Sequence, residues 1–165
     1  MRIFIIIGLL LLLGCESPKK KYDFTFFKWN IRESYYLKFN SSDTLYYVDV
    51  YGYKEETSFA ILNKDEKERI ENILDTITFL KEEVFDNNMI EDGQTYAFLL
   101  KNDKQSRKLK IHGRNGPTQF WMFGESLEKI KDNHTFIKMN KKINLREINK
   151  MVIMPLPPNF KVDID

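Results

Sequence analysis

The uneven distribution of aromatic residues commits the first part of this chain to a sheet. Of its 23 aromatic residues, twelve lie between Tyr22 and Tyr53, mixed with β-branched residues. Such side chains fit the pleated, half-buried surface of a strand. Polar turn-forming residues interrupt the cluster at 40–43 and 54–56. We therefore predict an antiparallel meander of four strands, at 22–29, 35–39, 44–53 and 58–62.

A helix is predicted directly after the meander. Asn63 followed by Glu66 is a capping-box arrangement, with Asn in place of Ser or Thr. Apolar residues then recur at the spacing that places them on one helical stripe; they are Ile70, Ile73, Leu74 and Ile77. The helix is expected at 64–78, followed by a connecting stretch and a polar loop.

The pattern of the next segment predicts a hairpin of two strands, at 95–101 and 106–112, joined by a turn at 102–104. In its second strand Leu109 and Ile111 are expected to face the core. The residues that alternate with them are expected to face outward; they are Lys108, Lys110 and His112.

A second helix is predicted at 117–131, because Pro117 suits the first helical position and apolar residues follow at helical spacing. Further along, the patterns predict a short strand at 135–139, a helical turn at 145–149 and a closing strand at 151–154. This order of elements predicts an α+β fold, in which an antiparallel sheet carries two helices packed on one face.

The first fifteen residues have the pattern of a signal peptide. Arg2 precedes an apolar run at 3–13, and Gly14 and Cys15 close it. The run is shorter than the roughly 20 apolar residues that span a bilayer. The segment Leu12-Leu13-Gly14-Cys15 resembles the lipobox of bacterial lipoproteins. That resemblance implies cleavage before Cys15, a diacylglyceryl group on its sulfur and acylation of the new amine. The alternatives are an ordinary secretory signal with an incidental cysteine, and an uncleaved anchor helix.

Four parts of the chain follow from this interpretation: a signal peptide at 1–14, a lipidated cysteine and polar tether at 15–21, a single domain at 22–154, and a Pro-rich extended tail at 155–165. Cys15 is the sole cysteine, so its acylation leaves the domain without a thiol for a disulfide, a nucleophile or a metal. Removing 1–14 takes away one basic residue, Arg2, and leaves 25 Lys and Arg against 24 Asp and Glu. We expect no nucleic-acid partner and no cofactor beyond the lipid.

The domain also resembles domains of unknown function found in small bacterial lipoproteins. The resemblance covers roughly 35–130 and rests on the order of elements, on Asp92-Gly93 before a strand and on Gly116-Pro117 at the start of the last helix. It implies a fold and a membrane anchor, and no particular chemistry.

Residues suited to catalysis are few. The chain has two histidines, His112 and His134, both expected at the surface near loops. No nucleophile elbow, phosphate loop or metal-ligand motif accompanies them. The remaining enzymatic alternative is a small envelope hydrolase that uses histidine or carboxylate chemistry, with Asp49 paired to Glu91 or Asp92 in the manner of a glycosidase.

The third strand offers a candidate binding face, because Tyr47, Asp49, Tyr51 and Tyr53 alternate along it. Tyrosine rings of this kind can contact sugars or a protein partner, although the same rings commonly pack across strands. The sequence thus predicts a lipid-anchored, non-catalytic binding or accessory module of the bacterial cell envelope, with an inhibitor or immunity protein as one version. Its partner would be the membrane together with an envelope protein or a glycan.

Overall fold

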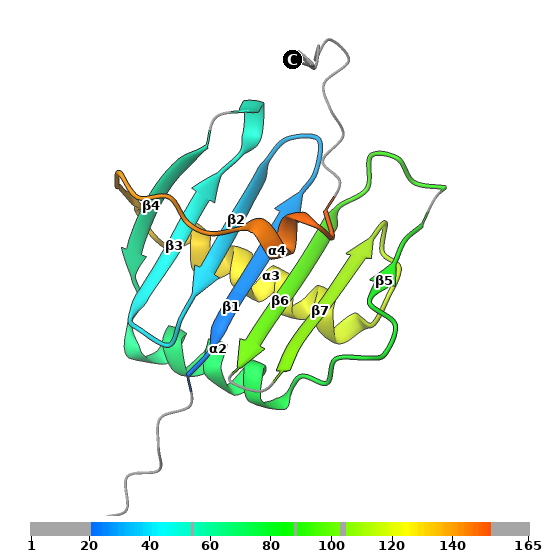
Figure 1. The fold of residues 1–165 in the computed structure, drawn as a ribbon, viewed down its shortest axis with the longest axis horizontal. Helices are drawn as coiled ribbons and strands as arrows, with labels where there is room; N and C mark the ends of the chain where they lie inside the picture. The colour runs from blue at the N-terminus through cyan, green and yellow to red at the C-terminus, as the bar shows by residue number, and fades with distance from the viewer. Residues whose placement is uncertain (1–20, 54, 88, 103–104, 153–165) are drawn as a thin grey trace, which may run out of the picture.

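The computed structural model describes residues 21–53, 55–87, 89–102 and 105–152, which form one sheet with helices on its faces (Figure 1). The predicted α+β fold is confirmed. The strands are β1 (Asp23–Trp29), β2 (Ser34–Phe39), β3 (Thr44–Asp49), β4 (Glu56–Ile61), β5 (Val84–Phe85), β6 (Thr95–Asn102), β7 (Gln105–His112) and β8 (Ile137–Lys138). The helices are the 3₁₀ turn η1 (Tyr51–Tyr53), α2 (Lys64–Thr76), α3 (Thr118–Asp132) and α4 (Arg146–Asn149).

The eight strands lie in the order β5-β7-β6-β1-β2-β3-β4-β8. The predicted meander is present as β1 to β4, and the predicted hairpin as β6 and β7; all of these pairs are antiparallel. The hairpin joins the meander through the pairing of β6 with β1. Two-residue strands close both edges: β8 pairs with β4, and β5 pairs with β7 in parallel.

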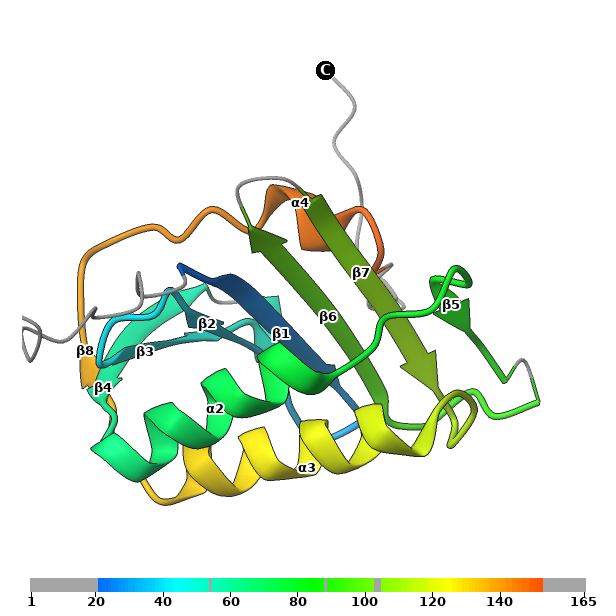
Figure 2. The same cartoon turned by 90° about the horizontal axis from the view of Figure 1, so that it is seen from below.

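Helices α2 and α3 lie side by side across one face of the sheet, as predicted (Figure 2). Register explains which side chains they cover, because Phe26 lies opposite both Leu37 and Phe98 on neighbouring strands. Residues opposite one another share a face of the sheet. This face supplies the larger core, in which β1, β2, β6 and β7 pack against the apolar stripes of both helices.

Helix α2 begins at the position that the capping box predicts, directly after Asn63. The side chain of Asn63 accepts a hydrogen bond from Glu66 N at 2.9 Å, and the Glu66 carboxylate accepts one from Asn63 N at 3.0 Å. Two backbone donors that a helix start leaves unpaired are thereby satisfied. Ile70 and Leu74 are the buried residues of this helix.

Helix α3 approaches the sheet closely at Gly124. A Cβ built on this glycine would lie 2.3 Å from a ring carbon of Tyr96. The helix therefore needs a glycine there, despite the low helix propensity of this residue. Pro117 is the N-cap of α3 rather than its first helical residue, a shift of one position from the prediction.

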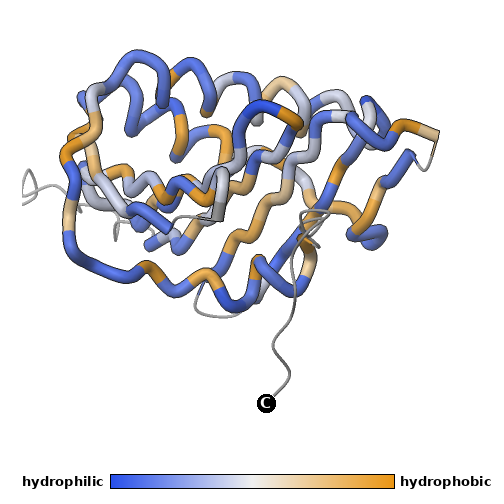
Figure 3. Tube along the Cα trace, turned by 90° about the horizontal axis from the view of Figure 1, so that it is seen from above, coloured by the Kyte–Doolittle hydropathy of each residue, from blue (hydrophilic) through white to orange (hydrophobic). Residues whose placement is uncertain are grey.

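The second face is covered by α4 and the chain that leads to it, which cross the sheet opposite α2 and α3 (Figures 1 and 2). A smaller core forms here from strand residues together with Leu145, Ile148 and Val152. The hydroxyl of Tyr36 in β2 donates a hydrogen bond to Asn149 Oδ1 at 2.7 Å. Hydrophilic residues mark the outer side of this crossing segment and of the helices (Figure 3).

Several predicted boundaries are wrong. The third strand ends at Asp49 rather than at 53, because the chain turns into η1 with Gly52 at a φ of 69°. The predicted strand at 135–139 is reduced to β8, and β5 was predicted as a connection. Met151 and Val152 lie in no strand, while the rest of the predicted closing strand, the tail at 155–165 and residues 1–20 lie outside the described residues. No helix within the described ranges is long and apolar enough to cross a membrane.

Candidate functional site

Tyr47, the first residue of the predicted binding face, lies on the face of the sheet that α2 and α3 cover. Its ring packs against Tyr35 and Phe136, with centroid separations of 5.3 Å and 5.1 Å. Burial, reinforced by nearby carboxylates, raises the pKa of Tyr47 to about 12. The ring-packing alternative therefore describes Tyr47 better than an open tyrosine face does.

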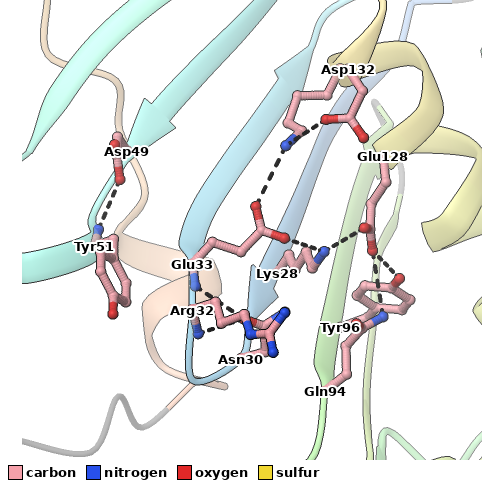
Figure 4. A network of polar contacts seen from close by, with 11 residues as sticks. Lys28, Asn30, Arg32, Glu33, Asp49, Tyr51, Gln94, Tyr96, Glu128 and Asp132 are labelled. Atoms are coloured by element: carbon pink, nitrogen blue, oxygen red, sulfur yellow. Dashed lines mark hydrogen bonds and ion pairs between the residues drawn. The ribbon is translucent and has the colours of Figure 1, made fainter.

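The other three members of that face lie where β3 gives way to η1. Asp49 Oδ1 accepts a hydrogen bond from Tyr51 N at 2.9 Å (Figure 4). The ring of Tyr51 is exposed, and its hydroxyl donates to Ile31 O at 3.2 Å. The side chain of Tyr53 lies outside what the structure describes. Asp49, the last residue of β3, keeps its alternation with Tyr47, but Tyr51 lies in η1, so the predicted alternation ends at Asp49.

His112 corrects the expectation of a surface histidine, because only 8% of it is exposed. Its Nε2 lies 2.5 Å from Ile90 O, and its Nδ1 lies 2.8 Å from Thr95 Oγ1. A carbonyl oxygen only accepts hydrogen bonds, so Nε2 carries a proton and both ring nitrogens are occupied. His112 therefore holds the loop that contains Ile90 against the end of the sheet.

The other acid–base candidates lie apart. His134 Nε2 contacts Glu66 Oε2 at 2.9 Å, beside the start of α2. Asp49 stands in β3, three strand spacings of about 4.8 Å from β6. The resulting separation, roughly 14 Å from the strand that follows Glu91 and Asp92, exceeds the roughly 5–9.5 Å between paired glycosidase carboxylates. The sequence candidates do not form such a pair.

The structure instead has a pocket of about 630 Å³ where β6 begins and β7 ends, against the side of α3. Pockets of about 300–1,000 Å³ are typical of small-molecule sites. The lining combines an aromatic and an aliphatic side chain with charged and amide groups; it consists of Ile90, Gly93, Gln94, Gly113, Arg114, Trp121 and Glu125.

Two glycines allow the loops of this pocket to approach each other. A Cβ on Gly93 would lie 2.8 Å from Ile90 Cγ2 and 3.0 Å from the Cα of Gly113. Gly113 has a φ of 62°, which favours glycine, and its N–H donates to Gln94 O at 3.1 Å. These close backbone contacts, together with the contact from His112 to Ile90, mean that backbone atoms form part of the pocket wall.

Arg114 also has a left-handed backbone, with a φ of 64°. This conformation is uncommon for a residue other than glycine, and strain of this kind is often found at functional sites. Arg114 is exposed and lines the pocket. Glu125, in α3, also lines the pocket. Neither side chain forms a hydrogen bond or an ion pair within the described part of the chain.

Trp121 gives the pocket a fixed aromatic wall. Its indole Nε1 donates a hydrogen bond to Asn115 O at 2.9 Å. Its ring packs on Tyr96 with a centroid separation of 5.1 Å. An aromatic ring held from both sides offers apolar surface at little cost in conformational entropy.

A network of charges around the buried ammonium of Lys28 adjoins the pocket (Figure 4). The ammonium of Lys28, a residue only 3% exposed, bonds to Glu33 Oε1 at 2.5 Å and to Glu128 Oε2. Tyr96 donates its hydroxyl to Glu128, and Gln94 Nε2 donates to the same carboxylate at 3.4 Å. Because Gln94 also lines the pocket, the network connects the pocket with the ends of β1 and β2.

These neighbours set the protonation of the network. Burial alone would raise the pKa of Glu33, but its hydrogen bond and charge interaction with Lys28, aided by Lys131, hold that pKa below the ordinary value of 4.5. Burial and the bond to Glu128 raise the pKa of Tyr96. Lys131 Nζ lies 4.7 Å from the ring centroid of Tyr35, whose buried hydroxyl has no hydrogen-bond partner in the described residues.

Sequence reasoning missed this pocket and its network, although one signal was present. Lys28 occupies the alternating position that follows Phe24 and Phe26 in β1, so a charge stands where an apolar residue is expected. The partners of Lys28 come from the turn before β2 and from α3, and their proximity depends on tertiary packing.

Comparisons add no relative to this description. In the described ranges, no group of three or more His, Cys, Asp or Glu side chains is arranged to hold a metal. No protein family, curated protein or solved structure matches this chain.

Proposed function

We propose that this protein is a bacterial lipoprotein, held at a membrane of the cell envelope by lipid on Cys15, and that it acts as a non-catalytic binding module. Its ligand site is the pocket between the start of β6, the end of β7 and α3. The observation that carries this proposal is a pair of opposite charges, Arg114 and Glu125, which line a ligand-sized pocket beside Trp121 and have no ion-pair or hydrogen-bond partner among the described residues.

The position of the pocket within the sheet suits a protein that presents its binding site away from a membrane anchor. The tether leads into Asp23 at the start of β1, which pairs with Lys101, whereas Trp29 at the end of β1 pairs with Thr95 beside the pocket. The six residue steps from Asp23 to Trp29, at about 3.3 Å each, place these ends roughly 20 Å apart. The pocket therefore lies at the end of the sheet opposite the entry of the chain.

The histidines predicted as acid–base candidates already contact other groups of the protein, which favours a binding function over hydrolysis. Both nitrogens of His112 are occupied, and His134 pairs with Glu66 at another part of the molecule. General acid–base catalysis requires a group within hydrogen-bond reach of the substrate. Neither histidine nor Asp49 lines the pocket.

Lipidation is tested with labelled fatty acid in cells that produce the full chain. We expect label on the wild-type protein, and its loss together with slower processing of the precursor in Cys15→Ala. The sulfur of Cys15 is the only thiol in the chain. Label that persists in Cys15→Ala would refute the lipid anchor.

Binding at the pocket is tested by photo-crosslinking in living cells. A crosslinking amino acid is placed at Met89, which is 92% exposed beside the lining residue Ile90, and at Ser42 in the turn after β2 as the matched control. Because β2 ends opposite Phe24, Ser42 lies at the far end of the sheet. A product formed from Met89 and not from Ser42 supports the proposal; equal products, or none, contradict it.

A further inference from the structure

The two charged walls of the pocket narrow the chemistry of its ligand. Arg114 and Glu125 come from different elements, share one pocket and form an ion pair neither with each other nor with another described residue. Removing a charge from water is costly unless an opposite charge replaces the water. A ligand that fills the pocket is therefore favoured if it brings an anion to Arg114 and a cation to Glu125.

The remaining lining indicates what lies between these two charges. Trp121 and Ile90 provide apolar surface, and the Trp121 ring is held in place by its bond to Asn115 O. Gln94 uses its amide nitrogen toward Glu128, which leaves its amide oxygen to accept a hydrogen bond from an N–H group. An apolar side chain and an amide or ammonium N–H match these groups.

We propose that the pocket binds a short peptide that carries a free ammonium end, a free carboxylate end and an apolar side chain. The carboxylate pairs with Arg114, whose planar guanidinium suits bidentate contact with a carboxylate. The ammonium pairs with Glu125, and the apolar side chain packs on Trp121. This inference rests on the proposed function, because it names the ligand class of the same pocket.

Size and charge together favour a peptide over two simpler ligands. The volume of about 630 Å³ exceeds what one small amino acid fills. A neutral sugar could stack on Trp121, but it would cover Arg114 and Glu125 without supplying a counter-charge. Binding of a saccharide at this pocket would therefore contradict the peptide inference and leave the proposed binding function intact.

The experiment measures binding to the full chain purified in detergent, by calorimetry and by the fluorescence of its two tryptophans, Trp29 and Trp121. The probes are alanyl-leucine, its doubly blocked form N-acetyl-alanyl-leucine amide, its N-acetylated form with a free carboxylate, and chitobiose as a neutral disaccharide. We expect alanyl-leucine to bind at least about tenfold more tightly than the doubly blocked form, since a hydrogen bond to a charged group contributes about one to two factors of ten. Added salt should weaken binding of alanyl-leucine.

Two variants test the role of each charged side chain in binding the peptide. Glu125→Gln keeps the shape of the side chain, and Arg114→Gly suits the left-handed backbone at φ 64°. Each should weaken alanyl-leucine by about tenfold or more. Glu125→Gln should not change the affinity of the N-acetylated peptide, because that probe has no ammonium. Glu82→Gln and Arg69→Gln, which change exposed charges outside the pocket, serve as matched controls and should change affinity less than about twofold.

The outcomes separate the two proposals. Equal affinity for the free and blocked peptides, or preferential binding of chitobiose, overturns the peptide inference; if Trp121→Ala abolishes that binding, the pocket remains the binding site. Binding of alanyl-leucine that Arg114→Gly and Glu125→Gln leave unchanged also overturns the inference. If no probe binds and Met89 yields no crosslink, both proposals fail.

Discussion

Close contact between Gly124 and the Tyr96 ring determines how the pocket and the charge network are built. The phenol of Tyr96 lies under α3, where its hydroxyl meets Glu128 and its ring supports Trp121. The glycine lets the helix axis come near enough for these two contacts. The absence of a side chain at Gly124 thus allows Trp121 to line the pocket and Glu128 to join the charge network.

Gly124→Ala should destabilise the protein, although alanine is the better helix former. Propensity alone would raise the free energy of unfolding by about 1 kcal/mol, but the new methyl would lie 2.3 Å from the Tyr96 ring. Overpacking of this kind typically costs about 1–3 kcal/mol, and a contact this short should fall toward the upper end of that range, so we expect a net loss of up to about 2 kcal/mol.

Urea unfolding followed by circular dichroism measures this change. Ser126→Ala in the same helix is the matched control, because its side chain is half-buried and the change should stay within about 0.5 kcal/mol. A gain in stability in Gly124→Ala would mean that α3 and Tyr96 are not in contact.

Individual contacts of this sort are the part of the site that lay beyond prediction. The sequence places Gly124 in a helix and Tyr96 in a strand, but it holds no information on which strand residue lies beneath which turn. Lys28 is similar: its exceptional position is visible in β1, whereas Glu33 and Glu128 become its partners only through register and packing.

Among the elements, α2 is the one whose start is encoded most locally. The capping box joins Asn63 and Glu66 across three residues, so it forms without tertiary contacts. Glu66 has a further partner in His134, which follows α3. The cap therefore begins one helix and also ties it to the end of the other.

Asn63→Ala should lower the free energy of unfolding by about 1 kcal/mol, within the range of about 0.5–2 kcal/mol for loss of an N-cap. The backbone N–H of Glu66 would lose its acceptor at the exposed start of α2. Thermal and urea unfolding measure the loss. Asn63→Ser keeps an acceptor oxygen and should retain most of the stability, so equal losses in both variants would argue against capping as the cause.

Elements with local signals were predictable, and those made by pairing were not. Helices α2 and α3, the hairpin and the meander each follow from spacing or turn residues. Strands β5 and β8 are two residues long and exist because Val84 lies beside Lys110 and Ile137 beside Phe59. Their own residues carry no pattern that a window of sequence could detect. The end of β3 was misjudged because alternation continues past Asp49 while the backbone turns.

At the scale of the whole molecule, both faces of the sheet are covered and both bury tyrosines. Tyr35 and Tyr96 lie beneath α2 and α3, and Tyr36 lies beneath α4. Burial is the largest cause that raises the pKa of each of these phenols above the ordinary value of 10.0. Ionisation of these side chains is therefore coupled to the packing of the entire sheet.

The protein should unfold cooperatively in alkali. A phenol with a raised pKa in the folded state releases its proton more readily when unfolded, so its contribution to stability is complete below pH 10.0 and falls as the pH rises beyond it. We expect absorbance of tyrosinate to rise in a step that coincides with loss of circular dichroism. In denaturant the eight tyrosines should instead titrate near pH 10. Complete titration near pH 10 with the fold intact would contradict the burial of these rings.

The two-residue outer strands have a consequence for behaviour at high concentration. An exposed sheet edge is a template on which another chain can add a strand. Here β5 and β8 each cover part of an edge, and the open stretch of β7 carries the exposed charges of Arg107 and Lys108. Charges on an edge discourage such addition. Addition of another copy of the protein to this edge of the sheet is therefore disfavoured.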